Sequence, residues 1–267
     1  MSSLLGLARA GSEAAKNWSR LRFISQIAVL ACGLLAFFVS GAPAYFAAVG
    51  ALVAQLASWV CALRAQQVHQ QAEQVRRRAI LFDALGGTAE RLDVTDLWRL
   101  FDEKTRARAA SLDEPDYYAS TRDPGPDRLM EILKESTFWS KHLYAVSARR
   151  AFKGVAAVIA CVLIFALLVL PNTSGEIPLL IARGLVLFLG FVVGVDQLGR
   201  AIAWTDAKNR LEALHRRLEL ASLDDMEPCL AIFSDYTAAT SLAPPIPTTV
   251  YESEREGLNS LWSDAGL

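Results

Sequence analysis

Residues 43–63 read PAYFAAVGALVAQLASWVCAL and contain no charged side chain. An α-helix crosses a bilayer with about 20 mostly apolar residues, because each residue advances the helix by about 1.5 Å. The polar side chains Gln55 and Ser58 interrupt an otherwise apolar stretch. The stretch therefore predicts a helix that is apolar all round, which is typical of a membrane span or of a completely buried core helix.

Three more apolar blocks of similar length predict an all-α integral membrane protein with two transmembrane hairpins and helical cytoplasmic regions. The four blocks are 23–40, 43–63, 154–170 and 178–199. A soluble bundle is the alternative, but the remaining sequence has too few amphipathic helices to cover four such helices. We interpret the first block as an uncleaved anchor, since it is long for a signal peptide.

The basic residues predict the orientation of the spans. Every Lys and Arg except Arg183 lies outside the four blocks and their two turns. The positive-inside rule then places both termini and the middle segment in the cytoplasm. The predicted parts are a cytoplasmic N-terminal segment 1–22, a first hairpin 23–63, a cytoplasmic helical region 64–153, a second hairpin 154–199, and a cytoplasmic helix with an acidic, proline-containing end, 200–267.

Composition and motifs exclude several functional classes. The 27 Lys and Arg residues balance 28 Asp and Glu residues, so we expect no binding of polymeric nucleic acid. The four cysteines and three histidines lack metal-ligand spacing, and no phosphate-binding or nucleophile motif occurs. We therefore expect neither a metal nor a cofactor, nor catalytic residues, and we do not expect an enzyme.

The second span of each hairpin continues into a charged helix that carries an apolar seam. The two seams are Val68, Ala72, Val75, Ala79 and Phe82, and Trp204, Ala207, Leu211, Leu214 and Leu218. We expect the seams to pack on each other or on other subunits. The first of these two charged helices should end near Gly86. The prolines at 244–247 should separate the helix that precedes them from the helix that follows them.

Small and polar residues within the spans are candidates for helix packing or for a pore. Small residues four positions apart let helices approach closely, and intramembrane polar groups are often functional. This set comprises Gly50, Ala54, Gln55, Ser58, Arg183, Gly190, Gly194 and Asp196. Outward extension of Arg183 and an i,i+4 pair between Asp196 and Arg200 are the simpler interpretation.

Clusters of basic and aromatic residues in the middle segment are candidates for a nucleotide site. Arg binds phosphate in a forked geometry, and aromatic rings stack on bases. The candidates are Arg76, Arg77, Arg78, Arg106, Arg108, His142, Arg149, Arg150, Trp139 and Tyr144. The alternative is a solvated helix face with juxtamembrane charges.

Two stretches carry a family resemblance: Glu135-Ser136-Thr137-Phe138-Trp139-Ser140, and Ala243-Pro244-Pro245-Ile246-Pro247-Thr248 leading through Tyr251 and Arg255 to Leu258-Asn259 and Leu261-Trp262. In these stretches and in its organisation, the chain resembles the SMODS-associated four-span effector family. The resemblance implies a bacterial inner-membrane protein encoded beside a cyclic-oligonucleotide synthase in antiphage defence, with a pore-forming or membrane-disrupting role.

We therefore expect a homo-oligomer in the lipid bilayer that senses a cyclic oligonucleotide. Four helices make a packed bundle, so a pore would have to be shared between chains. A constitutive scaffold or small transport subunit, which recruits a cytoplasmic partner through its helices, is the alternative. A membrane enzyme would need a polar cluster at one depth of the spans, and the sequence does not indicate one.

Overall fold

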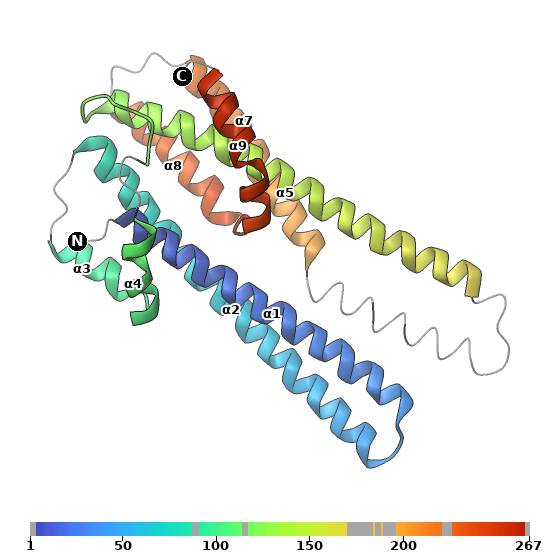
Figure 1. Ribbon diagram of the computed structural model, residues 1–267. Helices are drawn as coiled ribbons and strands as arrows, with labels where there is room; N and C mark the ends of the chain where they lie inside the picture. Colours follow the sequence, from blue (N-terminus) through green and yellow to red (C-terminus); the bar gives the residue numbers. More distant parts are fainter. Residues whose placement is uncertain are drawn as a thin grey trace. The chain divides into compact units, whose positions relative to one another are not determined.

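The computed structural model describes residues 4–86, 91–113, 117–169, 184, 188, 196–220 and 226–264, and within them it is helical and contains no strand. The elements are α1 (Leu4–Phe38), α2 (Ala42–Leu85), α3 (Arg91–Arg99), α4 (Glu103–Ala109), the 3-10 turn η1 (Ala110–Leu112), α5 (Pro126–Val169), α7 (Gln197–Leu220), α8 (Met226–Leu242) and α9 (Thr248–Asp264) (Figure 1). The expected all-α class is thus confirmed for this part of the chain.

The helices contribute to two compact units. One comprises Asn17–Ala65 and Arg149–Ala201 and is called here the apolar unit. The other comprises Met1–Lys16, Gln66–Ala148 and Ile202–Leu267 and is called the bundle unit. The helices α1, α2, α5 and α7 each contribute residues to both units without interruption.

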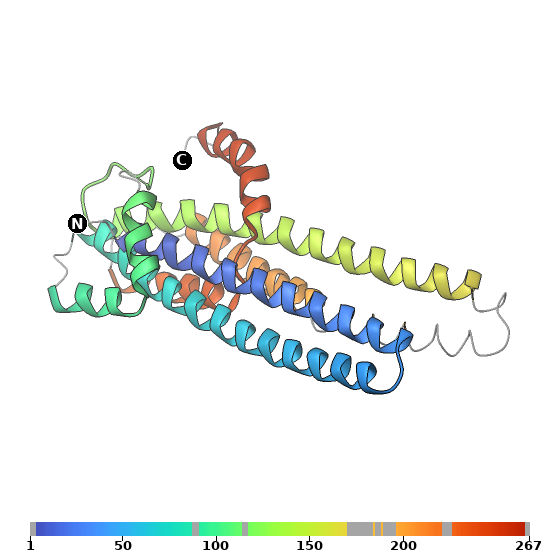
Figure 2. The same ribbon diagram turned by 60° about the horizontal axis from the view of Figure 1, so that its bottom comes forward.

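The apolar unit contains an antiparallel hairpin of α1 and α2, which lie side by side in both ribbon views (Figure 2). Gly41 lies in the turn with φ +70°, a conformation that favours glycine. Both helices are long and apolar enough to cross a membrane, and only 6% and 11% of their most apolar windows are buried. A core helix of a soluble protein would be mostly buried, so the exposure distinguishes these two helices from that class.

The helix α5 extends into the third predicted span and is helical to Val169. It also exposes large apolar side chains, among them Leu163 and Leu167, the latter 73% exposed. Most of the fourth predicted span, including Arg183, Gly190 and Gly194, lies outside the described residues, as does the turn 171–178; within this span the structure describes only positions 184, 188 and 196–199. Two membrane-competent helices are therefore established, and the four-span arrangement stays a prediction.

Both predicted seams face the core of the bundle unit. All five residues of the second seam are buried, and Ala72, Val75 and Ala79 are buried in the first. The helix α2 ends at Leu85, and Gly86 follows with φ +62°, as expected for a helix C-terminus. The two helices that flank the proline segment, α8 and α9, are also confirmed.

The N-terminal residues are part of the bundle core, although the sequence indicated only a short cytoplasmic segment. Leu7 and Ala10 of α1 pack in one cluster with Val75 of α2 and Phe101. The contact is close: a Cβ atom on Gly11 would lie 2.5 Å from a ring carbon of Phe101. Small residues at the start of α1 therefore set the distance between it and its neighbours.

Candidate functional site

A polar network joins three helices inside the bundle unit. His69, Glu73 and Arg76 follow one another at helical spacing on α2 and therefore lie on one face of that helix. This face points into the bundle because the positions beside it, Ala72 and Val75, are buried small or branched apolar residues. Polar side chains in such a place require partners, since unpaired buried polar groups are costly.

Arg76 is the centre of this network. Its Nη2 and Nε atoms donate to Oε2 of Glu73 at 2.7 and 3.1 Å, and its Nη1 donates to the hydroxyl of Tyr236 on α8 at 2.8 Å. The Tyr236 side chain is completely buried, and its hydroxyl lies 3.5 Å from Oγ of Ser140 on α5. The guanidinium thus links α2 to α8, and through Tyr236 it also links α2 to α5.

The charge states of the network follow from burial and from the neighbouring charges. Burial raises the pKa of Glu73, but the nearby Arg76 and His69 outweigh it and hold that pKa below its ordinary value. Burial raises the pKa of Tyr144, and the Glu73 carboxylate raises it further. Near neutral pH Glu73 is therefore a carboxylate beside the Arg76 guanidinium, and the buried phenol of Tyr144 is un-ionised.

The proline segment between α8 and α9 is attached to two other helices. The Nε2 atom of His69 lies 3.0 Å from the carbonyl oxygen of Ala243, and the indole of Trp204 on α7 donates to the carbonyl of Pro244 at 2.9 Å. Because a carbonyl only accepts, His69 carries its proton on Nε2. Burial is the main reason that the pKa of His69 lies below 6.5. These two side chains fix the segment 243–247 on the bundle.

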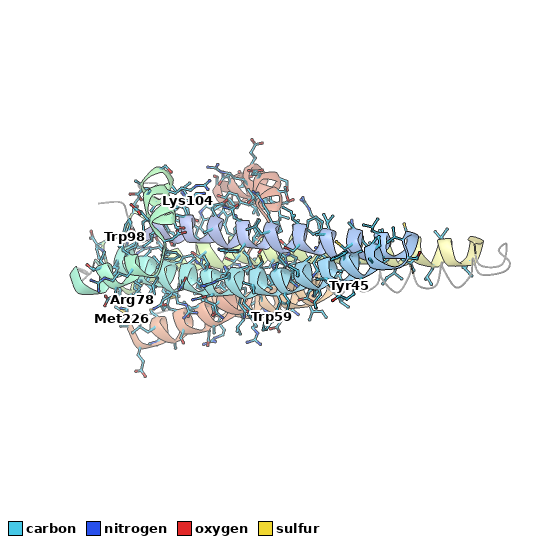
Figure 3. All side chains as sticks on the ribbon, turned by 90° about the horizontal axis from the view of Figure 1, so that it is seen from below. Tyr45, Trp59, Arg78, Trp98, Lys104 and Met226 are labelled. Atoms are coloured by element: carbon cyan, nitrogen blue, oxygen red, sulfur yellow. The ribbon has the colours of Figure 1, made fainter. Side chains whose placement is uncertain are left out.

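The predicted nucleotide residues fall into separate groups. Arg76 belongs to the polar network, Tyr144 is buried in the bundle unit, and Arg77 donates to the carbonyl of Thr237 on α8 at 3.1 Å. Three others, Arg78, Arg106 and Arg108, are exposed in the bundle unit (Figure 3 labels Arg78).

The remaining candidates divide between α5 contacts and the apolar unit. The ring centres of His142 and Phe138 are 5.5 Å apart, and those of Trp139 and Tyr251 are 6.4 Å apart. Arg149 and Arg150 are exposed in the apolar unit. Ligand binding by this set of ten residues stays a prediction.

The two stretches that carry the family resemblance contact each other. Phe138 and Trp139 of α5 pack with Leu258 of α9 around a buried cluster. The ring centres of Phe138 and Trp262 are 5.3 Å apart, which adds an aromatic contact near the end of α9. Residues more than a hundred positions apart in the sequence therefore form one interface between α5 and α9.

The small-residue stripe on α2 packs against α1 of the same chain. A Cβ atom on Gly50 would lie 3.4 Å from Sγ of Cys32. Two helical turns further along, Nε2 of Gln26 donates to Ser58 at 2.7 Å and to Gln55 at 3.2 Å. Both Gln26 and Ser58 are 2% exposed, so the hydrogen bond between them is buried, whereas Gln55 is exposed. Ala54 is half-buried on the same stripe.

Asp196 immediately precedes α7 and has a positive φ of 53°. It is exposed, and its carbonyl oxygen accepts from the backbone nitrogen of Arg200 at 3.2 Å. A role in a pore stays a prediction for Asp196, as it does for the span residues outside the described part.

Sequence reasoning missed Gln26, Glu73 and Tyr236. Gln26 could have been found, because it is a polar residue in the first span that pairs with the polar residues of the second. Glu73 lies three positions before Arg76, a spacing that favours an ion pair on a helix. No local pattern indicated Tyr236, because its partners lie on other helices.

Comparison of the chain with protein-family models, with curated protein sequences and with solved structures finds no match.

Proposed function

We propose that the protein is a membrane effector of bacterial antiphage defence, which oligomerises and permeabilises or depolarises the inner membrane in response to a cyclic oligonucleotide. The observation that carries the membrane part is the apolar surface of α1, α2 and α5. Tyr45, Phe46 and Trp59 of α2 are 68%, 70% and 62% exposed; Figure 3 labels Tyr45 and Trp59. A surface of this kind is stable in lipid or against another subunit, and costly in water.

The proposal places four spans in the membrane with both termini in the cytoplasm. The family resemblance supplies the biological setting, and the continuity of α1, α2 and α5 between the units supports a regulated mechanism. A ligand can drive opening only if it binds the open arrangement more tightly than the resting one. Each continuous helix would transmit such a rearrangement from the bundle unit to its span.

Within this proposal the exposed residues Arg78, Arg106 and Arg108 are the candidates for contact with nucleotide phosphate. They are accessible, whereas Arg76 and Arg77 already donate to groups on the bundle. We assign Arg76 to the internal network, where it would couple the helices rather than bind the nucleotide. A pore would be shared between subunits, because Gly50 and Ser58 are used inside the hairpin.

The test is release of an encapsulated dye from liposomes that contain the full chain, with a panel of cyclic di- and trinucleotides. We expect release with one nucleotide, and we expect R78A/R106A/R108A to require more of it. The matched control is R99A/R210A/R216A, which removes three exposed charges elsewhere in the bundle unit and should respond normally.

A constitutive scaffold is the second candidate. It is favoured by the internal use of Arg76 and Arg77, which removes two members of the predicted phosphate cluster. Absence of release with every nucleotide, together with a small stable complex in detergent, would contradict the effector proposal and support the scaffold.

A further inference from the structure

Charge is divided unevenly between the two units. The apolar unit contains eight basic residues and only two acidic residues, Glu176 and Asp196, so its net charge is +6. Since the whole chain has a net charge of -1, the bundle unit is strongly acidic. Although the chain as a whole is nearly neutral, its apolar unit is therefore basic, and the two carboxylates of that unit are too few to balance its eight basic residues.

Seven of the eight basic residues lie close to the positions where the chain passes between the two units. We call them the basic collar: Arg20, Arg22, Arg64, Arg149, Arg150, Lys153 and Arg200. Five of these side chains are exposed, namely Arg20, Arg64, Arg149, Arg150 and Lys153.

The hairpin contact shows that two collar residues lie at the same level. Gln26 of α1 bonds to Ser58 of α2, and the two helices are antiparallel. Arg20 lies six residues before Gln26 and Arg64 lies six residues after Ser58. Each is therefore about 9 Å along its helix from the shared contact, in the same direction. The opposite end of the hairpin contains no basic residue.

Exposed aromatic residues accompany the collar. Trp59 precedes Arg64 on α2 and is 62% exposed, while Phe152 adjoins Lys153 on α5 and is 40% exposed. Tryptophan and long basic side chains are typical of the level of the lipid headgroups. Charge thus marks one end of the exposed apolar surface, and Trp59 and Phe152 lie beside the collar residues in the sequence.

We propose that the basic collar binds the phosphate groups of anionic phospholipids. Arg matches phosphate oxygens in a forked geometry, and Lys acts as a point charge. This inference rests on the proposed membrane location and specifies the lipid that the apolar unit prefers. It also assigns Arg149 and Arg150 to lipid phosphate rather than to a nucleotide site.

Brominated lipids provide the test, because they quench nearby tryptophan, and Trp18 and Trp59 both belong to the apolar unit. The full chain is placed in phosphatidylcholine vesicles with increasing amounts of either brominated phosphatidylglycerol or brominated phosphatidylcholine. We expect phosphatidylglycerol to bind about fivefold more strongly for each collar residue engaged. This preference should weaken as the salt concentration rises.

Three variants isolate the collar. R149Q/R150Q/K153Q should lose most of the preference for phosphatidylglycerol, whereas R149K/R150K should keep most of it because the charge is retained. The control R99Q/R210Q/R216Q removes three exposed charges from the bundle unit and should behave like the unmodified chain.

Equal quenching by the two lipids in the unmodified chain would overturn the lipid preference and leave the membrane location intact. An unchanged preference in R149Q/R150Q/K153Q would overturn the assignment of those residues. Absence of quenching by either lipid would instead contradict the proposed membrane location. The comparison in the unmodified chain decides the lipid preference even if the glutamine variant fails to fold.

Discussion

Replacement of Arg76 by Met should destabilise the bundle unit strongly, although the apolar part of the side chain is retained. The change removes two hydrogen bonds to Glu73 and one to Tyr236. It leaves the Glu73 carboxylate, whose side chain is 13% exposed, without its cation. Breaking a buried ion pair in this way costs about 3–5 kcal/mol, and we expect about 3 kcal/mol here because the pair is partly accessible.

The assay is thermal unfolding of the full chain in detergent, followed by circular dichroism. For a domain of 150–250 residues, 1 kcal/mol corresponds to about 2–4 °C, so Tm should fall by about 6–12 °C. The neighbouring variant R78M, at an exposed position, should change stability by less than about 0.5 kcal/mol. The double variant E73Q/R76M should recover much of the loss, since it also removes the uncompensated charge.

The pH dependence provides an independent check. The lowered pKa of Glu73 contributes stability above pH 4.5, its ordinary pKa, and that contribution is lost as the pH falls through the folded-state pKa. The difference between R76M and the unmodified chain should therefore shrink on acidification. A variant R76M with unchanged Tm at pH 7 would refute the structural role and return Arg76 to the candidates for nucleotide binding.

Three further changes test other parts of the structure by thermal unfolding. G11A should lower the free energy of unfolding by about 1–3 kcal/mol through overpacking against Phe101. G257A, at a position with open space around it, should raise the free energy of unfolding by up to about 1 kcal/mol. Equal effects of the two changes would contradict the close packing of α1. The lowered pKa of His69 predicts that stability declines as the pH falls below 6.5, because the unfolded chain then binds a proton that the folded chain excludes. The variant H69Q should flatten this decline. An unaltered pH profile in H69Q would disprove the role of His69. Q26L should destabilise the hairpin by about 0.6–2 kcal/mol through loss of its bonds to α2, and no loss would show that apolar packing alone holds the hairpin.

The sequence predicted helix positions well where a local pattern records them. The seam from Trp204 to Leu218 repeats at helical spacing, and its residues are buried as expected. Gly86 likewise indicated the end of α2. The packing of the N-terminal residues was harder to predict, because it depends on Phe101, which is distant in the sequence.

The candidate site was predicted only in part for the same reason. An arginine run indicates positive charge, but it does not reveal which guanidinium has a partner inside the fold. Arg76 and Arg78 are two positions apart and therefore point in different directions on the helix, one toward Tyr236 and the other toward solvent.

By itself, the sequence determined the helical class, the apolar stretches long enough to cross a membrane and the uneven distribution of basic residues. Each of these properties depends on the kind and spacing of residues along one segment. Only the tertiary structure decided that Gln26 bonds to Ser58, that Arg76 bonds to Tyr236 and that the segment 243–247 attaches to α2 and α7. These contacts join residues on different helices, and their geometry exists only after the helices have packed.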